Sequence, residues 1–166
     1  NDNVQAGFDA TEYFIKKGCK RIAFIGGTKR LFVTQDRLTG YESALKQHQL
    51  PIDTNLTYFA TEFLEEKGYQ FSELLFNHDP QIDAIITTDS LLAEGVCDYI
   101  SKHQLTVPVL SFDSVNPRLD LVAYVDINSL ELGRVSFETI LQIINDAKNN
   151  KQICYRQLIG HKIIEK

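Results

Sequence analysis

Short apolar runs alternate with segments of helical periodicity along the whole of this chain. The strand-like runs are 21–25, 56–61, 83–89, 107–113 and 121–127. The helix-like segments run from Asp2 or Asn3 to Gly18 and then cover 35–48, 65–76, 90–103 and 129–147. Such alternation with short connections is typical of a parallel sheet with helices on both faces. The sequence therefore predicts an α/β fold, closed by one or two further strands within 153–166.

Charge and composition exclude several kinds of protein. The net charge is −5, and Lys and Arg form no run longer than a pair, so the chain lacks the basic face that binds a nucleic-acid backbone. No apolar run approaches the ~20 residues of a membrane span, and no signal peptide is recognisable. Neither the three cysteines nor the four histidines have metal-ligand spacing. We expect no metal, no cofactor and no membrane partner.

Polar and aromatic residues follow the predicted strands at the points where the strands end. Because the carboxyl ends of parallel strands meet at one edge of a sheet, ligands bind there. Arginine offers a fork of donors, aspartate accepts from hydroxyl groups, and an aromatic ring covers an apolar sugar or base face. The residues expected at this edge are Gly26, Gly27, Arg37, Phe63, Thr87, Thr88, Asp89, Asp113 and Ser114.

Structural roles compete with ligand binding for four of these side chains. Asp89 precedes a helix and could be its N-cap, and Phe63 could be part of the core. Arg37 could be a solvated charge near a helix start, although a positive charge is unfavourable there. Asp113 directly follows a buried strand and could be a cap or a binding residue. No nucleophile-elbow, zinc-protease or dinucleotide motif is present, so the pattern favours binding over catalysis.

Four segments in order and spacing resemble the effector-binding core of the lactose-repressor/galactose-repressor family of transcription regulators. They are "NVQAGFDATEYFIKKGCKRIAFIGG", "DRLTGYESAL", "AIITTDSLLAEGV" and "VPVLSFDS". The resemblance covers about 1–149 and implies one lobe of the two-lobed fold of periplasmic sugar-binding proteins.

The resemblance also implies roles for individual residues. Arg37 and Asp113 match positions that hold the hydroxyls or polar edge of an effector. Phe63 matches an aromatic position, and Thr88 and Asp89 match an Asn-Asp step. Cys19 replaces the usual histidine, Thr88 replaces the common asparagine, and 114–120 is shorter than usual. The implied ligand-binding set is Arg37, Phe63, Thr88, Asp89 and Asp113.

The family resemblance implies a domain organisation and a function. We expect 1–128 to be the C-terminal lobe, 129–157 a crossover to the N-terminal lobe and 158–166 a return strand, with the DNA-binding domain and most of the first lobe absent. The implied protein is a cytoplasmic, dimeric repressor and not an enzyme. It senses a small effector, a sugar or sugar phosphate, and contacts operator DNA only through its N-terminal domain. The alternative is an extracytoplasmic sugar-binding protein of a transport system.

The predicted helix 129–147 carries more apolar side chains than one face can hold. If the first lobe normally covers this helix, part of it must be exposed, swapped or packed on another copy here. The side chains in question are Leu130, Val135, Phe137, Ile140, Leu141, Ile143 and Ile144.

Overall fold

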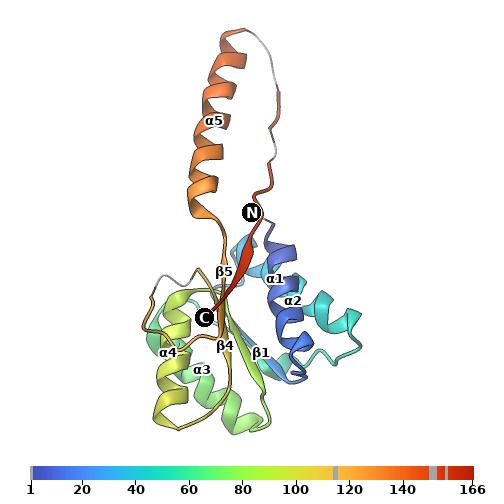
Figure 1. The fold of residues 1–166 in the computed structure, drawn as a ribbon, viewed down its shortest axis with the longest axis vertical. Coiled ribbons are helices and arrows are strands. Elements are labelled where there is room, and N and C mark those ends of the chain that lie inside the picture. The colour runs from blue at the N-terminus through green and yellow to red at the C-terminus, as the bar shows by residue number, and fades with distance from the viewer. Residues whose placement is uncertain (1, 114–115, 150–152, 156) are drawn as a thin grey trace.

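The computed structural model describes residues 2–113, 116–149, 153–155 and 157–166. Its strands are β1 (Ile22–Gly26), β2 (Thr57–Phe59), β3 (Ala84–Thr87), β4 (Val109–Phe112), β5 (Ala123–Asp126) and β6 (Lys162–Glu165). Its helices are α1 (Asn3–Lys16), α2 (Phe32–Gln47), α3 (Glu65–His78), α4 (Ser90–Lys102) and α5 (Ser129–Lys148), with a 3₁₀ turn at Thr54–Leu56. The elements alternate as the sequence predicts (Figure 1).

The described strands form a sheet in the order β2-β1-β3-β4-β5-β6. The first five strands in this order are parallel, and β6 runs antiparallel to β5. The prediction of a parallel sheet flanked by helices is therefore confirmed. The closing segment contributes only Lys162–Glu165 as a strand, which is shorter than the return strand expected over 158–166.

Alternate residues of the central strands point into two separate cores, because side chains alternate across a strand. Phe24 of β1 and Ile86 of β3 lie side by side in the core beneath α1 and α2. Ile25 and Ile85 belong to the opposite core, together with buried residues of α3 and α4. Figure 1 shows the two helix pairs on opposite sides of the sheet.

Glycines allow α1 and α2 to cross at very short distance. A Cβ at Gly40 of α2 would lie 2.1 Å from the carbonyl oxygen of Val4, and one at Gly7 of α1 would lie 2.2 Å from that of Arg37. A methyl group at either position would force the two helices apart. The crossing therefore fixes the first turns of α1 beside Arg37.

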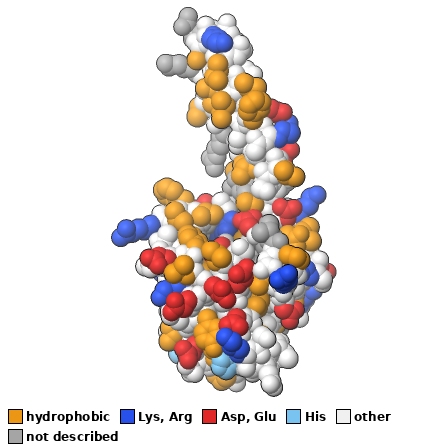
Figure 2. All heavy atoms as spheres, turned by 90° about the vertical axis from the view of Figure 1, so that its left-hand side faces the viewer, with side chains coloured by type: hydrophobic (Ala, Val, Ile, Leu, Met, Phe, Trp, Pro, Cys, Tyr) orange, Lys and Arg blue, Asp and Glu red, His pale blue; other side chains and the backbone are white. Residues whose placement is uncertain are grey.

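Helix α5 leaves the carboxyl edge of the sheet and stands away from it, and β6 lies back in the sheet beside β5 (Figure 1). Its apolar side chains are uncovered: Leu130 is 88% exposed and Phe137 is 63% exposed. Figure 2 shows these hydrophobic side chains along the projecting helix. The expectation that part of this set is exposed is confirmed, since Ile140, Leu141, Ile143 and Ile144 are exposed as well, while Val135 is half-buried.

Although α5 is long and partly apolar, it also carries the exposed ion pairs of Arg134 with Glu131 and Glu138. Among the residues that the structure describes, no helix combines the length and the apolar character needed to cross a bilayer.

Candidate functional site

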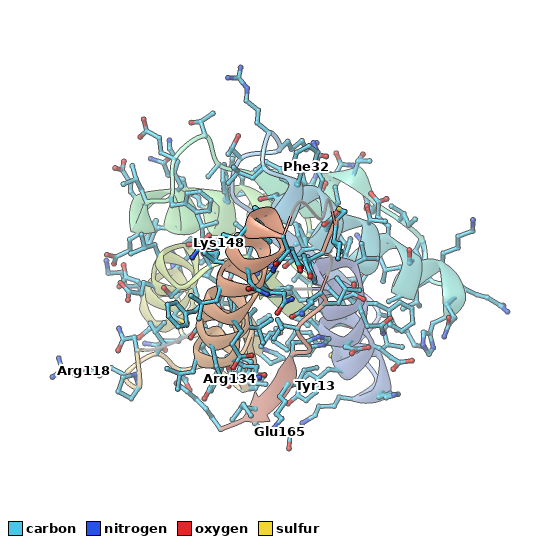
Figure 3. The ribbon with its side chains drawn as sticks, turned by 90° about the horizontal axis from the view of Figure 1, so that it is seen from above. Tyr13, Phe32, Arg118, Arg134, Lys148 and Glu165 are labelled. Carbon is cyan, nitrogen blue, oxygen red and sulfur yellow. The ribbon has the colours of Figure 1, made fainter. Side chains whose placement is uncertain are left out.

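The carboxyl edge of the sheet brings four of the five predicted ligand-binding residues into one cluster. Arg37 reaches this edge from α2, Thr88 and Asp89 follow β3, and Asp113 follows β4. Hydrogen bonds join Arg37 to the Thr88 backbone and Thr88 to Asp89, and Asp113 lies 3.9 Å from Arg37. Figure 3 looks down on the edge from above, with α5 standing over it and Phe32 marking the start of α2.

Arg37 is the centre of the cluster and is only 5% exposed. Its Nη1 donates to the carbonyl oxygen of Thr88 at 2.7 Å, and its Nε donates to Oδ1 of Asn3 at 3.3 Å. The Phe112 ring covers one face of the guanidinium, with its centroid 4.0 Å from Cζ. Burial lowers the pKa of Arg37 to about 10, against the opposing effect of Asp113 and Asp89, so the group stays charged at neutral pH.

Asp113 faces Arg37 across a gap. Its Oδ2 lies 3.9 Å from Nη2 of Arg37, which is too long for a direct hydrogen bond. The residue holds a left-handed conformation with φ of 56°, and its backbone N–H donates to the carbonyl oxygen of Val125. Burial raises the pKa of the Asp113 carboxyl, while the Arg37 charge and the backbone amide of Ile127 oppose that rise. The carboxylate is thus part-exposed and lies 3.9 Å from the Arg37 guanidinium.

Thr88 and Asp89 hold the loops of the cluster together. The Thr88 hydroxyl accepts a hydrogen bond from the backbone N–H of Gly27 at 2.9 Å, which ties the β1 turn to β3. Oδ1 of Asp89 accepts from the N–H of Leu92 at 3.0 Å, so the N-cap interpretation of Asp89 is confirmed. Burial nevertheless raises the pKa of the Asp89 carboxyl. Asp89 is therefore a second part-buried carboxylate beside the same arginine.

Phe63 lies at the rim of the cluster and is 37% exposed, which argues against the core-packing interpretation. Its ring lies directly against Gly27, where an added Cβ would be 2.2 Å from the nearest ring carbon. A Cβ at Gly26 would likewise be 3.1 Å from the Phe59 ring. The two glycines therefore allow aromatic rings to lie against the turn, a role quite different from a phosphate-binding loop.

Two sequence-based expectations need correction. Helix α2 begins at Phe32, earlier than the predicted residue 35, so Arg37 lies in its second turn and not at its head. Arg37 is also buried, which excludes the solvated-charge interpretation. Ser114 lies outside the described residues. Sequence reasoning missed Asn3 and Phe112, which contact the Arg37 guanidinium.

A cavity of about 450 Å³ lies near the amino ends of β4 and β5, where Cys97, Ile100, Pro108 and Asp120 contribute to its lining. None of the predicted ligand-binding residues lines it. Over the part of the chain that the structure describes, His, Cys, Asp and Glu side chains form no group of three or more that could hold a metal ion.

The chain matches known proteins over most of its length. The profile of the periplasmic binding protein-like domain family matches residues 11–160. The HTH-type transcriptional regulator MalR of Streptococcus pneumoniae is 84% identical over 166 residues, which are 100% of this chain and 51% of that protein. The chain thus spans about half the length of this curated relative.

Solved structures of other proteins have the same fold. The crystal structure of a putative transcriptional regulator LacI from Bacillus cereus subsp. cytotoxis superposes with a TM-score of 0.88 at 31% identity, covering 100% of this chain and 60% of that one. The transcriptional regulator CelR, solved as a cellobiose complex, has a TM-score of 0.85 at 21% identity, covering 98% of this chain and 51% of that one.

Proposed function

Because the chain belongs to the periplasmic binding protein-like domain family, we propose that it is the effector-sensing part of a transcriptional regulator. The 84% identity to the pneumococcal MalR regulator over all of this chain supports a regulator over a transport protein. We propose that the cluster around Arg37 is the effector site. We also propose that the rest of the regulator carries a DNA-binding domain.

The observation that carries this proposal is the gap between Arg37 and Asp113. An oxygen atom placed to one side of the line that joins Nη2 and Oδ2, which are 3.9 Å apart, can lie within hydrogen-bond reach of both atoms. A hydroxyl group suits this position, because it accepts from the guanidinium and donates to the carboxylate at the same time. The effector we propose is therefore rich in hydroxyl groups, as a sugar is.

The charge of the cluster favours a neutral sugar over a sugar phosphate. One guanidinium stands with two carboxylates, those of Asp89 and Asp113, and burial raises the pKa of each carboxyl. An added phosphate would bring further negative charge into this part-buried environment. The Phe63 ring at the rim offers the apolar surface on which a pyranose ring packs. The CelR–cellobiose complex shows that this fold accommodates a neutral disaccharide in another protein.

Asp113 also couples effector binding to the segment that leads into α5. The backbone amide of Ile127, just before α5, lies close enough to lower the pKa of the Asp113 carboxyl. Asn128, the N-cap of α5, holds a left-handed conformation with φ of 56°. We propose that a sugar bound at Asp113 stabilises one orientation of this connection and so favours closure of the two lobes. Closure in a homodimer would then change the spacing of two DNA-reading heads in the cytoplasm.

A thermal-shift screen of the full-length protein tests the proposal. The panel holds glucose, maltose, cellobiose and glucose 6-phosphate. A ligand present at 100 times its Kd stabilises the native state by about 2.7 kcal/mol. We expect a neutral saccharide to raise Tm and to change operator binding in the same concentration range. A protein that responds to none of the neutral sugars, or only to the phosphate, would contradict the proposed effector class.

A further inference from the structure

We propose that Asn3 is a positioning residue that sets the orientation of the Arg37 guanidinium for the effector. This inference rests on the proposed effector site. Asn3 belongs to neither the strand ends nor the loops where binding residues were expected. It is the first residue of α1, and its Oδ1 accepts the hydrogen bond from Nε of Arg37 at 3.3 Å.

The contacts of Arg37 leave one edge of its guanidinium for a ligand. An arginine side chain has five N–H donors in a rigid plane. Nε donates to Asn3 and one N–H of Nη1 donates to Thr88. Together with the Phe112 ring on one face, these bonds fix the plane and the rotation of the group. The N–H groups of Nη2 are thereby directed to the side where Asp113 lies 3.9 Å away.

Asn3 is the contact that holds the Nε end of the group, while Thr88 holds the Nη1 end. The Phe112 ring covers one face but does not fix the position of the group over that face. With the Nε bond removed, changes in the side-chain torsions of Arg37 can shift the group about its bond to Thr88 and move Nη2 away from Asp113. Arg37 would remain buried, charged and bonded to Thr88, so the predicted loss is in ligand binding and not in folding.

The local structure frees Asn3 for this role. Asp2 caps α1, because its Oδ1 accepts from the N–H of Gln5 at 3.0 Å, so the Asn3 side chain is not needed as the cap. The close crossing at Gly7 and Gly40 holds the first turn of α1 against α2 at Arg37. A side-chain acceptor at position 3 is therefore kept within reach of Nε by backbone packing on both sides.

Two substitutions of similar size separate the acceptor from the bulk of the side chain. Asn3→Leu removes the acceptor, and Asn3→Asp keeps it. Gln5→Leu is the matched control, since Gln5 is exposed in the same turn and bonds to Asp9. In the full-length protein we expect Asn3→Leu to raise the Kd of the stabilising saccharide about tenfold, or about 1.4 kcal/mol. Asn3→Asp should stay within about threefold of the wild type, as should Gln5→Leu.

A second measurement follows the Arg37 group itself and needs no ligand. In ¹⁵N NMR spectra, the Nε–H of Arg37 should exchange slowly with water in the wild type and in Asn3→Asp, and should exchange faster in Asn3→Leu. Equal saccharide affinity and equal Nε–H exchange in Asn3→Leu and wild type would overturn the inference. If no saccharide binds the wild type, the proposed function fails, and the exchange rates still decide whether Asn3 holds Arg37.

Discussion

Nη2 of Arg37 and Oδ2 of Asp113 face each other at 3.9 Å across the carboxyl edge of the sheet. Arg37 is held on three sides by Asn3, Thr88 and Phe112. Asp113 is held by its backbone bond to Val125 in β5. We infer that these two groups of opposite charge, too far apart for a direct hydrogen bond, can share a bridging hydroxyl of the effector.

Removal of the Arg37 side chain should abolish the effector response. A hydrogen bond to a charged group contributes about 1.5–3 kcal/mol, so Arg37→Ala should raise the Kd of the saccharide by about 10- to 150-fold. Titration calorimetry of the full-length protein measures this change. Arg30→Ala, at an exposed arginine of the preceding loop, is the control and should leave the Kd unchanged. Equal losses in both variants would point to a general charge effect.

Effector affinity should fall in mild acid because the bridging hydroxyl needs an ionised Asp113. Burial raises the pKa of this carboxyl above its ordinary value of 3.8, so protonation begins at a higher pH than in a free carboxyl. Acid has the opposite effect on the contribution of Asp113 to folding stability. Its raised pKa means that the native state binds the proton more tightly than the unfolded state does. The ionised group therefore destabilises the fold at neutral pH, and this cost falls as the pH drops and the carboxyl is protonated. Calorimetry between pH 4 and 7 should show this loss of affinity in the wild type and a weak affinity with a smaller pH dependence in Asp113→Asn, where the Asp89 carboxyl remains.

A methyl group at Gly27 should disturb the site more than the fold. The Cβ of Gly27→Ala would lie 2.2 Å from the Phe63 ring, which must move, and this ring is part-exposed and free to do so. We expect a loss of saccharide affinity of at least about threefold with a Tm change of only a few degrees. Phe63→Leu should lose affinity in the same way. Unchanged affinity in both variants would exclude the ring from the site.

Alanine should have opposite effects on stability at two helical glycines, one at the crossing of α1 and α2 and one in the exposed helix α5. Gly40→Ala places a Cβ 2.1 Å from the carbonyl oxygen of Val4 and should lower the free energy of unfolding by at least about 2 kcal/mol. A Cβ added at Gly133 in α5 would meet nothing within 4 Å apart from its own stretch of helix, so Gly133→Ala should raise the free energy of unfolding by up to about 1 kcal/mol through helix propensity. Urea unfolding of the two variants compares the effects. A harmless Gly40→Ala would contradict the close crossing that supports Asn3.

The exposed apolar face of α5 should make the 166-residue chain associate when it is produced alone. Phe137, Ile140 and Leu141 are all more than half exposed, and a large bare apolar patch promotes association. Light scattering should show oligomers that dissociate when these three side chains are replaced by serine. Leu74→Ser, at an exposed leucine of α3, is the control and should have no such effect. A monomeric wild-type chain at high concentration would argue against this prediction.

The sequence predicted the fold and most of the cluster for physical reasons that are local. Apolar runs that alternate with helical periodicity define the sheet, and its topology brings Arg37, Thr88, Asp89 and Asp113 to one edge. The resemblance to lactose-repressor/galactose-repressor regulators is confirmed by the matches to known proteins.

The contacts around Arg37 could not be predicted because they depend on packing between distant segments. Asn3 reaches Nε because two glycines let α1 and α2 cross closely. The distance between crossing helices cannot be predicted from the sequence alone. Phe112 looks like any buried strand residue until the guanidinium is placed on its ring. The start of α2 was missed because its N-cap is Leu31, which makes no side-chain capping bond.

A crystal structure of the full-length protein with the saccharide that stabilises it tests the central claim most directly. The account predicts a sugar hydroxyl oxygen between Nη2 of Arg37 and Oδ2 of Asp113, within about 3 Å of each. It also predicts the Phe63 ring against the apolar face of the same sugar. A sugar bound elsewhere, such as in the cavity beside Cys97, with Arg37 and Asp113 making no contact to it, would contradict the account.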